Sequence, residues 1–341
     1  MAKLPQGTRW ALDPQDDFSH APEAASNYNE SMYFSVFDAD ARTGGWYRLG
    51  NRVNEGYAEM SLCWYLPDGR VAFMASRPEI SSNERMDAGG LSFEIVEPLE
   101  RHRVRYEGRA CLLEHPHEMS DPSRAFRENP IVPVRMEIDH RAASPCPGGE
   151  VVKQDGTPLP IDPEKGFGKA HFDQQMFGEG FIEVDGTRQP VRGAGARDKT
   201  WGPRYWQSIE WYRWIHFYVS PACSMMATVM SDPESGHGVK GFLFANGTTH
   251  ELAGGELSSE WDERSHVRSL DFRTTAAGSD YEIHGDVVSL IPLRNRRQGP
   301  DGEMLMTRIT EGMTEFTCNG QKALGMAEYL DQIVDGRPIG I

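Results

Sequence analysis

The middle of the chain combines a carboxyl group, two imidazoles and several indole rings. Asp198 is preceded by His171 and followed by His216. Four of the eight tryptophans fall within residues 201–214. Burial in an apolar site raises the pKa of a carboxyl group and makes it a proton donor, while aromatic faces stabilise a positive charge that develops on a substrate. These residue types predict acid–base chemistry on an apolar molecule.

Residues 211–219 have the alternating pattern of a β-strand, in which successive side chains point to opposite faces. A buried Tyr or Trp needs a hydrogen-bond partner for its OH or NH group, so a dry core would use aliphatic side chains instead. The aromatic and polar side chains on one face of this strand therefore predict that the face lines an enclosed cavity for an unsaturated or ring-containing ligand. The alternative is a Trp-rich core strand in which His216 is hydrogen-bonded. That face carries Tyr212, Trp214, His216 and Tyr218, and the opposite face carries Trp211, Arg213, Ile215, Phe217 and Val219.

Two interpretations of Asp198 follow from its neighbours. A carboxyl group that faces an apolar cavity loses hydration, so its pKa rises and it can donate a proton. Arg197 and Lys199 flank it in the sequence and favour the ionised form instead. The alternative to a catalytic acid is thus a structural ion pair with Arg197 or Arg204.

Asp-Gly and Asn-Gly pairs divide the chain into short segments. Both central residues of a type I′ turn need a positive φ, so such pairs mark tight hairpins. Period-2 segments such as 58–64, 181–184 and 191–195 lie between them, and long amphipathic helical patterns are scarce. Many short strands with regular turns predict an all-β sandwich or barrel, and a barrel leaves no strand edge exposed. The pairs are Asp68-Gly69, Asp155-Gly156, Asp185-Gly186, Asn246-Gly247, Asp301-Gly302, Asn319-Gly320 and Asp335-Gly336.

The length of 341 residues fits two domains of roughly 170 residues each. Residues 142–168 are rich in Pro, Gly and charge and are typical of a linker or a long loop. We therefore expect one domain at residues 1–165 and a second at residues 166–341. A short helix is expected at 122–128 with Asp121 as its N-cap, whereas 321–333 has mixed periodicity and fits either a strand or a helix.

The composition excludes several kinds of partner. The net charge of −16 disfavours nucleic acid and anionic membranes, and the short basic run at residues 294–297 fits a solvated loop. No window of 18 apolar residues predicts a membrane span, and residues 1–17 lack the apolar core of a secretory signal. The five cysteines are scattered and never form a CxxC pair, which indicates reduced thiols in a cytoplasmic protein. A homodimer is compatible with this composition.

Motifs for metals and nucleotides are weak or missing. His115-Pro-His117-Glu118 lacks the spacing of a metal site, and we expect no bound metal. Gly193-x-Gly195 lacks the third glycine of a dinucleotide fingerprint, and the sequence has no P-loop or GxSxG motif. Cys63 and Cys223 fit core positions better than nucleophiles. No cofactor is therefore predicted.

The pattern Gly193-x-Gly195-x-Arg197-Asp198-Lys199-x-Trp201-Gly202 resembles the RDHSWG-type signature of the carotenoid 1,2-hydratase (hydroxyneurosporene synthase) and AttH-like superfamily. Residues 29–34, followed by Phe37-Asp38 and Arg48-Leu49-Gly50, are similar to the opening of bacterial members. Glu311-Gly312 and the later Gly325-x-x-Glu328-Tyr329 are similar to their ending. The resemblance implies two fused lipocalin-like antiparallel β-barrels, with the RDxxWG motif in the C-terminal one. Lys199 stands where a His is common, so direct His assistance to Asp198 does not carry over.

The chemistry that the resemblance implies is acid-catalysed hydration of an isolated isoprenoid double bond, and its fungal relatives include hydratases of prenylated phenols and lipocalin-like cyclases. Hydration needs one acid to protonate carbon, one base to position water, and aromatic faces for the cation. We expect Asp198 to be the acid, with His216, Glu210 or His171 on the water side. The predicted substrate-binding residues are Trp201, Arg204, Trp206, Tyr212, Trp214 and Tyr218.

The sequence thus predicts a cofactor-independent lyase that acts on an apolar isoprenoid or aromatic small molecule. The same groups would also serve a dehydratase, an isomerase or a carbon–carbon lyase, and the sequence does not choose among them. The alternative is a carrier protein that binds a lipid or terpenoid without chemistry, as barrels can.

Overall fold

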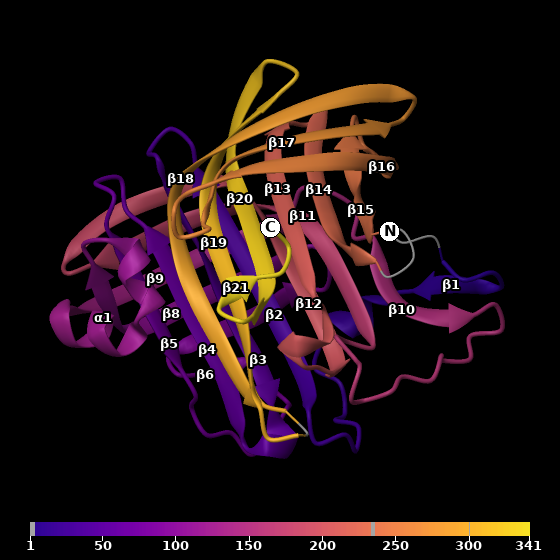
Figure 1. Ribbon diagram of the computed structural model, residues 1–341, viewed down its shortest axis with the longest axis horizontal. Coiled ribbons are helices and arrows are strands. Elements are labelled where there is room, and N and C mark those ends of the chain that lie inside the picture. The colour runs from indigo at the N-terminus through magenta and orange to yellow at the C-terminus, as the bar shows by residue number, and fades with distance from the viewer. Residues whose placement is uncertain (1–3, 233–235, 300) are drawn as a thin grey trace. The chain divides into compact units, whose positions relative to one another are not determined.

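The computed structural model describes residues 4–232, 236–299 and 301–341, and this part of the chain is almost entirely β-structure (Figure 1). The helical segments in these ranges are short. They are the expected helix α1 (Pro122–Glu128) and the 3-10 turns η1 (Pro14–Asp17), η2 (Val53–Glu55), η3 (Pro116–Ser120) and η4 (Trp206–Ser208). The all-β prediction with two fused antiparallel barrels is confirmed.

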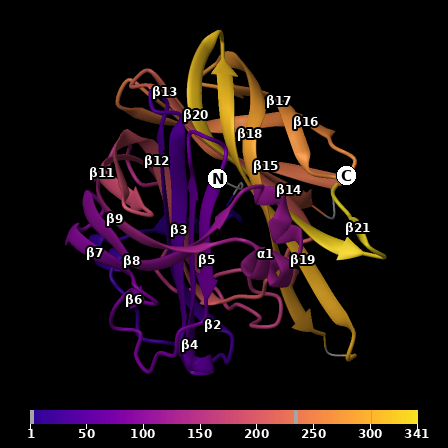
Figure 2. The ribbon, with the colours of Figure 1, turned by 90° about the vertical axis from the view of Figure 1, so that its left-hand side faces the viewer.

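The first barrel is a closed ring of antiparallel strands. Each strand pairs with the next one around the ring, and the last, β12, pairs with the first, β2, so that every edge is satisfied. Figure 2 shows the indigo and purple strands of this ring. In ring order they are β2 (Tyr28–Asp38), β3 (Thr43–Arg52), β4 (Tyr57–Tyr65), β5 (Val71–Ser76), β8 (Arg101–Leu113), β9 (Ile131–Ala142), β11 (Ala170–Val184) and β12 (Thr187–Pro203).

Shorter strands extend this ring at two places. β1 (Thr8–Ala11) and β10 (Gly148–Lys153) continue from β11, and β6 (Asp87–Ala88) and β7 (Leu91–Glu97) continue from β8. The ring therefore carries two additional ribbons built from its own unit.

The second barrel closes in the same manner. Its strands follow one another in chain order, and β13 pairs with β20 to complete the ring, as the orange and yellow ribbons of Figure 1 show. The short β21 (Arg337–Pro338) pairs with the end of β20. The strands are β13 (Trp211–Ser220), β14 (Cys223–Asp232), β15 (Gly236–Ala245), β16 (Thr248–Trp261), β17 (Val267–Ala276), β18 (Ser279–Gln298), β19 (Met304–Cys318) and β20 (Gln321–Val334). The segment with mixed periodicity, 321–333, is thus a strand.

The two compact units divide the chain differently from the expected boundary at residue 165. The first-barrel unit contains residues 4–115 and 123–208, and the second-barrel unit contains residues 116–122 and 209–341. β11 and β12 belong to the first ring because they pair with β9 and β2. The assignment of the RDxxWG motif to the C-terminal barrel is therefore wrong. The Pro- and Gly-rich stretch expected to be a linker contains β10 and a loop of the first-barrel unit.

The Asp-Gly and Asn-Gly pairs adopt the expected hairpin geometry at four places. Both central residues have positive φ at Asp185-Gly186, Asn246-Gly247, Asn319-Gly320 and Asp335-Gly336, as a type I′ turn requires. At the other three pairs only the glycine has positive φ. The Asp185 turn joins β11 to β12 and sets their register, which the site described below depends on.

Side chains fill the interior of each ring. The first core combines residues from β2, β3, β4, β8 and β9, among them Phe34, Tyr47 and Trp64. The second core contains Ile215, Phe217 and Phe316, and the last two rings stack at 4.8 Å. An eight-stranded ring is just wide enough for side chains to fill, so this packing is the ordinary outcome.

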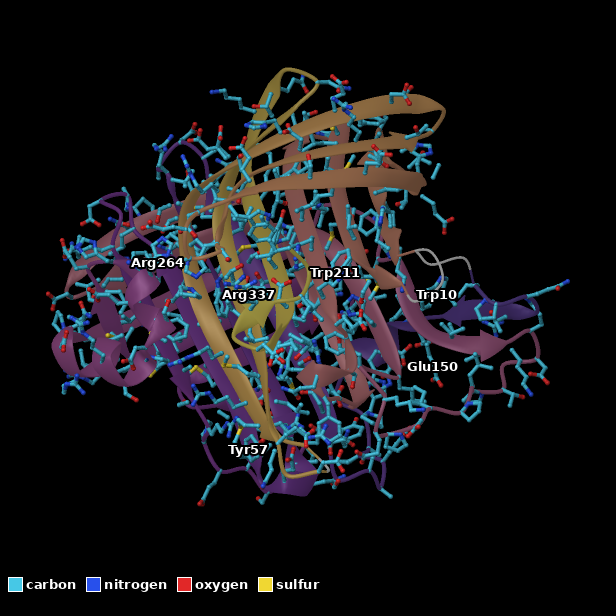
Figure 3. The ribbon with its side chains drawn as sticks, in the orientation of Figure 1. Trp10, Tyr57, Glu150, Trp211, Arg264 and Arg337 are labelled. Carbon is cyan, nitrogen blue, oxygen red and sulfur yellow. The ribbon has the colours of Figure 1, made fainter. Side chains whose placement is uncertain are left out.

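The predicted strand at 211–219 is confirmed as β13, which begins at Trp211 (Figure 3). Ile215 and Phe217 point into the barrel core, so the row that contains Tyr212, Trp214 and His216 lies on the outer face of the barrel. The row therefore does not line a cavity inside this barrel, because the opposite face of the same strand packs its interior.

Candidate functional site

The Arg197–Trp201 segment divides between the two faces of β12. Arg197, Lys199 and Trp201 point into the first barrel, where Arg197 Nη1 lies 2.6 Å from an oxygen of Asp17. Asp198 and Thr200 alternate with them and point outward. The signature therefore contains one structural set of residues and one set that is available for chemistry.

The inward Arg197 forms a buried ionic cluster. Its guanidinium bonds Asp17 and donates from Nε to Gln174 at 2.8 Å, while His102 Nε2 lies 2.8 Å from the second oxygen of Asp17. Burial raises the pKa of Asp17, but His102 and Arg197 outweigh burial and hold that pKa well below its usual range. The carboxylate of Asp17 is therefore ionised and paired inside the barrel, and these contacts hold η1 against β12.

Lys199 and Trp201 hold the N-terminal segment in the same way. Lys199 Nζ lies 2.8 Å from Glu30 and donates to the backbone carbonyl of Asp17 at 3.0 Å. Burial disfavours ionised Glu30, but His20 and Lys199 outweigh it and lower the pKa of Glu30 to about 2. Trp201 stacks on His20 at a ring distance of 4.1 Å. Trp201, a predicted substrate-binding residue, thus lies on the face opposite Asp198.

On the outer face, strand register places polar side chains in two rows across the sheet. Asp173, Asp198, Tyr33 and Arg48 are successive cross-strand partners on β11, β12, β2 and β3. The neighbouring row contains His171, Thr200, Ser31 and Gly50 in the same strand order. Since directly opposed side chains on one face lie roughly 5 Å apart, each row forms a continuous polar strip.

His171, Asp173 and Asp198 form the centre of these rows. Nε2 of His171 lies 3.2 Å from Oδ2 of Asp173, and Nδ1 lies 2.9 Å from the hydroxyl of Thr200. One nitrogen of His171 and one oxygen from each aspartate all lie within 4.8 Å of one another. Half of the His171 side chain is exposed, whereas both aspartates are partly buried. This Asp173–His171–Asp198 cluster is the candidate functional site.

The pKa values of His171 and Asp198 are both raised, so the cluster favours protonated side chains. Burial disfavours the charged form of His171, but the charges of Asp173 and Asp198 outweigh burial and raise the pKa of His171 to about 9. Burial and the charge of Asp173 raise the pKa of Asp198, although His171, Arg204 and Arg48 act in the opposite direction. His171 therefore carries a proton at neutral pH, next to a carboxyl group that takes up a proton more readily than usual.

Two guanidinium groups border the cluster. The Arg204 guanidinium packs between two rings, with its carbon 4.2 Å from the centre of Phe167 and 4.4 Å from that of Trp206. Arg48 lies 5.4 Å from the Trp206 ring. Gly50 leaves room for Arg48, because a Cβ there would approach its guanidinium to 2.7 Å. Arg204 and Trp206, both predicted to bind substrate, are thus brought to one surface of the first-barrel unit.

The cluster also has the donor set of a metal site. One imidazole and two carboxylates could bind a divalent cation such as Zn²⁺ or Mn²⁺. A ligating imidazole must be neutral, however, and the pKa of His171 near 9 keeps its ring protonated. Arg48 and Arg204 add positive charge beside Asp198. These residues fit a proton better than a metal ion, and the prediction that no metal is bound stays a prediction.

The remaining predicted residues belong to the second-barrel unit. The Tyr212 hydroxyl donates to Glu328, and Glu328 is the cross-strand partner of both Trp214 and Glu311. The His216 ring lies 4.7 Å from Trp214, and burial lowers the pKa of His216 to about 3. Glu210 precedes β13, and Tyr218 lies near its end. Tyr212, Trp214 and His216 thus share one face with two carboxyl groups, and His216 is neutral.

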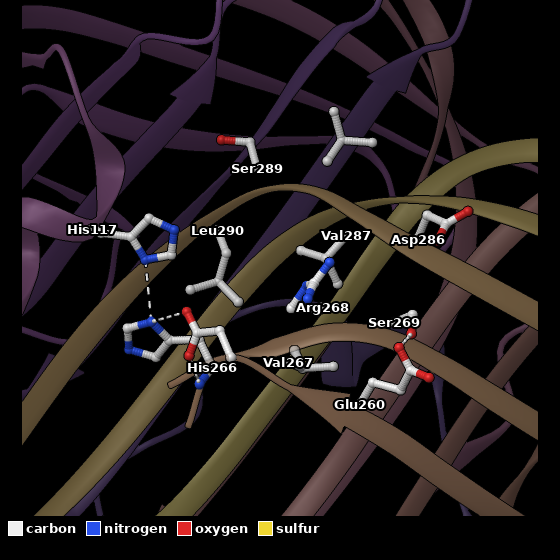
Figure 4. Close-up of a pocket in the computed structure, with 12 residues that line it drawn as sticks. His117, Glu260, His266, Val267, Arg268, Ser269, Asp286, Val287, Ser289 and Leu290 are labelled. Carbon is white, nitrogen blue, oxygen red and sulfur yellow. Dashed lines mark hydrogen bonds and ion pairs between the residues drawn. The ribbon is translucent and has the colours of Figure 1, made fainter. Parts of the chain in front are cut away.

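A polar pocket of about 330 Å³ lies elsewhere in the second-barrel unit (Figure 4). His117 on η3 and His266 face each other there, with their Nδ1 atoms 3.1 Å apart. One ring must donate and the other accept, so the pair contains at least one neutral imidazole. The contact between the two rings ties η3 to the barrel. Asp262 accepts a hydrogen bond from the backbone N–H of His266 and holds that residue in place. We interpret it as structural.

Sequence reasoning missed Asp173, Tyr33, Thr200 and Arg48. The Asp185-Gly186 turn was a usable signal, because a two-residue hairpin that pairs 184 with 187 necessarily pairs Asp173 with Asp198. Tyr33 and Arg48 reach the site because β12 pairs with β2, and the sequence has no turn or motif that predicts this pairing.

Comparisons with solved structures agree on the architecture. A candidate AttH (NE1406) from Nitrosomonas europaea superposes with a TM-score of 0.61 at 14% identity, and covers 97% of this chain and 98% of its own. CghA superposes with a TM-score of 0.53 at 10% identity over 96% of this chain and 97% of its own, and it has also been solved with Sch210972. Kievitone hydratase from Nectria haematococca gives a TM-score of 0.49 at 11% identity over 96% of both chains. The expected likeness to the AttH-like superfamily is confirmed for the fold.

Three further findings concern the sequence and its helices. None of the curated proteins matches the chain at a significant level. Among the helices in the described ranges, none has the length and apolar character needed to cross a membrane. One family model matches residues 13–333, which is nearly the whole chain. The chain therefore belongs to the family described as "Domain of unknown function (DUF7064)".

Proposed function

We propose that this protein is a cofactor-independent acid–base lyase of the hydratase or dehydratase type, and that its substrate is an apolar isoprenoid or aromatic small molecule. The observation that carries the proposal is the Asp173–His171–Asp198 cluster, in which the pKa of Asp198 is raised beside a His171 whose pKa is about 9. Perturbed titratable groups gathered on one surface are typical of catalytic sites.

Asp198 and His171 have distinct roles in the proposal. Asp198 donates the proton to a substrate carbon or oxygen, and His171, within 4.8 Å, restores that proton from solvent because half of its ring is exposed. Asp173 holds His171 in its protonated form at 3.2 Å. The two groups titrate as a pair, so the pH profile of the reaction belongs to the pair and not to either residue alone.

The residues around the cluster suit a substrate with rings or double bonds. Trp206 presents an indole beside Arg204 and Arg48, and the guanidinium groups can bind an oxygen of the substrate. The substrate-binding role predicted for Tyr212, Trp214 and Tyr218 and the water-positioning role predicted for His216 or Glu210 stay predictions, because these residues belong to the second-barrel unit. CghA, a protein of similar fold, has been solved with Sch210972, which supports the proposal that this chain binds a ligand.

The test separates binding from turnover. Mass spectrometry of small molecules retained by the purified protein supplies a ligand, and incubation with the wild type reveals its conversion. Asp198→Asn keeps the size of the side chain and removes the acid, so we expect the ligand to bind and turnover to fall by about 10²–10⁴-fold. Asp185→Asn is the matched control, since Asn also adopts the positive φ of that turn position. Equal turnover in both variants would remove Asp198 from the mechanism.

A carrier that holds a ligand inside a barrel is a weaker candidate. The interior of the first barrel contains the Arg197–Asp17 and Lys199–Glu30 ion pairs, and the second is packed with aromatic and aliphatic side chains. A lipid inside the first barrel would have to displace charged groups that are already paired, at a high cost in free energy.

A further inference from the structure

Two thiols in the second-barrel unit are in direct contact. The Sγ atoms of Cys223 and Cys318 are 3.7 Å apart, although the two residues are 95 positions apart in the chain. None of the five cysteines is in a disulfide bond in this structure. The contact is independent of the Asp173–His171–Asp198 cluster and of the proposed lyase chemistry.

The barrel topology explains how these thiols meet. Cys223 forms the last pair of the β13–β14 hairpin with Ser220, and Cys318 forms the last pair of the β19–β20 hairpin with Gln321. β14 and β19 are not neighbours, because β13 and β20 lie between them in the ring. Both side chains point inward, since Cys318 belongs to the second core and Cys223 packs against it. The thiols therefore face each other across one end of the barrel.

We propose that Cys223 and Cys318 are an oxidant-sensitive pair that forms a disulfide bond across this end of the second barrel. A disulfide has an S–S length of about 2.0 Å, so the sulfur atoms must approach by about 1.7 Å. Both residues adjoin hairpin turns, Pro221-Ala222 and Asn319-Gly320, where a small backbone shift disturbs few ladder hydrogen bonds.

The two thiols have different parts in the reaction. Cys223 is partly exposed, and its contact with Cys318 lowers its pKa, whereas that same contact and burial raise the pKa of Cys318. The Cys223 thiolate attacks hydrogen peroxide and becomes a sulfenic acid, with release of hydroxide. Cys318 then attacks that sulfur, the S–O bond breaks, and water leaves. Overall, two thiols and one H₂O₂ give one disulfide and two H₂O, so the peroxide is reduced and the thiols are oxidised.

The disulfide has a definite structural consequence. It would link two strands that no backbone ladder joins, near the Phe217–Phe316 stack. A cross-link over a long loop stabilises a fold chiefly by restricting the unfolded chain. We expect the oxidised protein to unfold at a temperature higher by about 5–10 °C, reversibly with a phosphine reductant.

The direct experiment uses the wild-type chain and hydrogen peroxide. After oxidation, alkylation under denaturing conditions should count three free thiols in place of the five of the reduced chain, and peptide mapping should find Cys223 cross-linked to Cys318. Five remaining thiols, or a cross-link between other cysteines, would overturn the proposal. This measurement needs no variant and so does not depend on how a substituted chain folds.

Variants then assign the two parts. In Cys318→Ser, a dimedone adduct should accumulate on Cys223, because no thiol resolves the sulfenic acid. In Cys223→Ser, Cys318 should remain unmodified. Cys111→Ser is the control, because Cys111 is buried in the first-barrel unit and its thiol donates to the Ala125 carbonyl, a bond that Ser can also make. Adduct formation on Cys318 instead of Cys223 would contradict the assigned order.

Discussion

Asp198 and Arg197 are adjacent in the chain, yet they lie on opposite faces of β12, and Arg197 is paired with Asp17 at 2.6 Å. The strand alternation that separates them answers a question that the sequence left open. A structural ion pair between Asp198 and Arg197 is ruled out, since that guanidinium is used inside the barrel. Asp198 faces the outer surface with Asp173 and His171 instead.

The stability of an Asp198 variant distinguishes a functional carboxyl group from a structural one. The raised pKa of Asp198 means that its ionised form is less favourable in the fold than in water. The stability contribution of this group therefore falls as the pH rises through its pKa. We expect Asp198→Asn to be at least as stable as the wild type in urea unfolding near pH 8. A loss of several kcal/mol would indicate a structural ion pair instead.

Titration of His171 tests the charge balance of the cluster. Its pKa of about 9 is raised by Asp173 and Asp198 and opposed by burial and Arg204. NMR of the imidazole should show that Asp173→Asn lowers this pKa and that Arg204→Met raises it. Because the folded pKa exceeds the unfolded value of 6.5, the stabilisation by the charged ring is complete below pH 6.5 and is lost as pH rises through about 9. Opposite shifts in the two variants would show that the charges are assigned wrongly.

The buried Asp17–Arg197 pair, on the face of β12 opposite the site, predicts a large effect on stability. Asp17→Asn leaves Arg197 as an uncompensated buried charge, so unfolding should become easier by about 3–5 kcal/mol. Asp40→Asn, at an exposed turn, is the control and should change little. Since the pKa of Asp17 is held below its usual value of 3.8, its contribution is present above about pH 4 and is lost as the pH falls. Equal effects of the two substitutions would contradict the ion-pair account.

His216 should behave as a neutral ring. Burial lowers its pKa to about 3, so its ¹⁵N shifts should stay constant between about pH 5 and pH 8. Its contribution to stability is complete above the unfolded value of 6.5 and is lost as pH falls below it, because only the unfolded chain then gains the proton. A midpoint near 6.5 in the folded protein would show that His216 is hydrated and would contradict its burial.

Local signals in the sequence predicted much of the fold. Tight turns such as Asn319-Gly320 and the alternation around Trp214 follow from backbone sterics and from the period-2 pattern of strands, so they can be read from nearby residues. The domain boundary could not be read in this way. It depends on the pairing of β12 with β2, between residues more than 150 positions apart, such as Asp198 and Tyr33. The Pro-rich stretch around residue 150 has the same composition whether it links two domains or forms a strand and a loop within one.

The candidate site was predictable in part for the same reason. Asp198 and His171 were identified by residue type, and Asp173 follows from the hairpin register at Asp185-Gly186. Trp201 was grouped with Asp198 because of their closeness in sequence, but an odd spacing along a strand sends the two side chains to opposite faces. The position of Arg48 beside the site depends on the pairing of β12 with β2 and on the space that Gly50 leaves for its guanidinium group, so it could not be predicted from nearby residues.

The most direct test of the central claim is deuterium incorporation from D₂O into the carbon skeleton of the retained ligand. A hydratase, a dehydratase run in reverse and an isomerase all move a solvent-derived proton to carbon, so this readout does not require the reaction to be named beforehand. We predict that the wild type and Asp185→Asn incorporate deuterium and that Asp198→Asn does not. Incorporation by Asp198→Asn at the wild-type rate would contradict the claim that Asp198 delivers the proton.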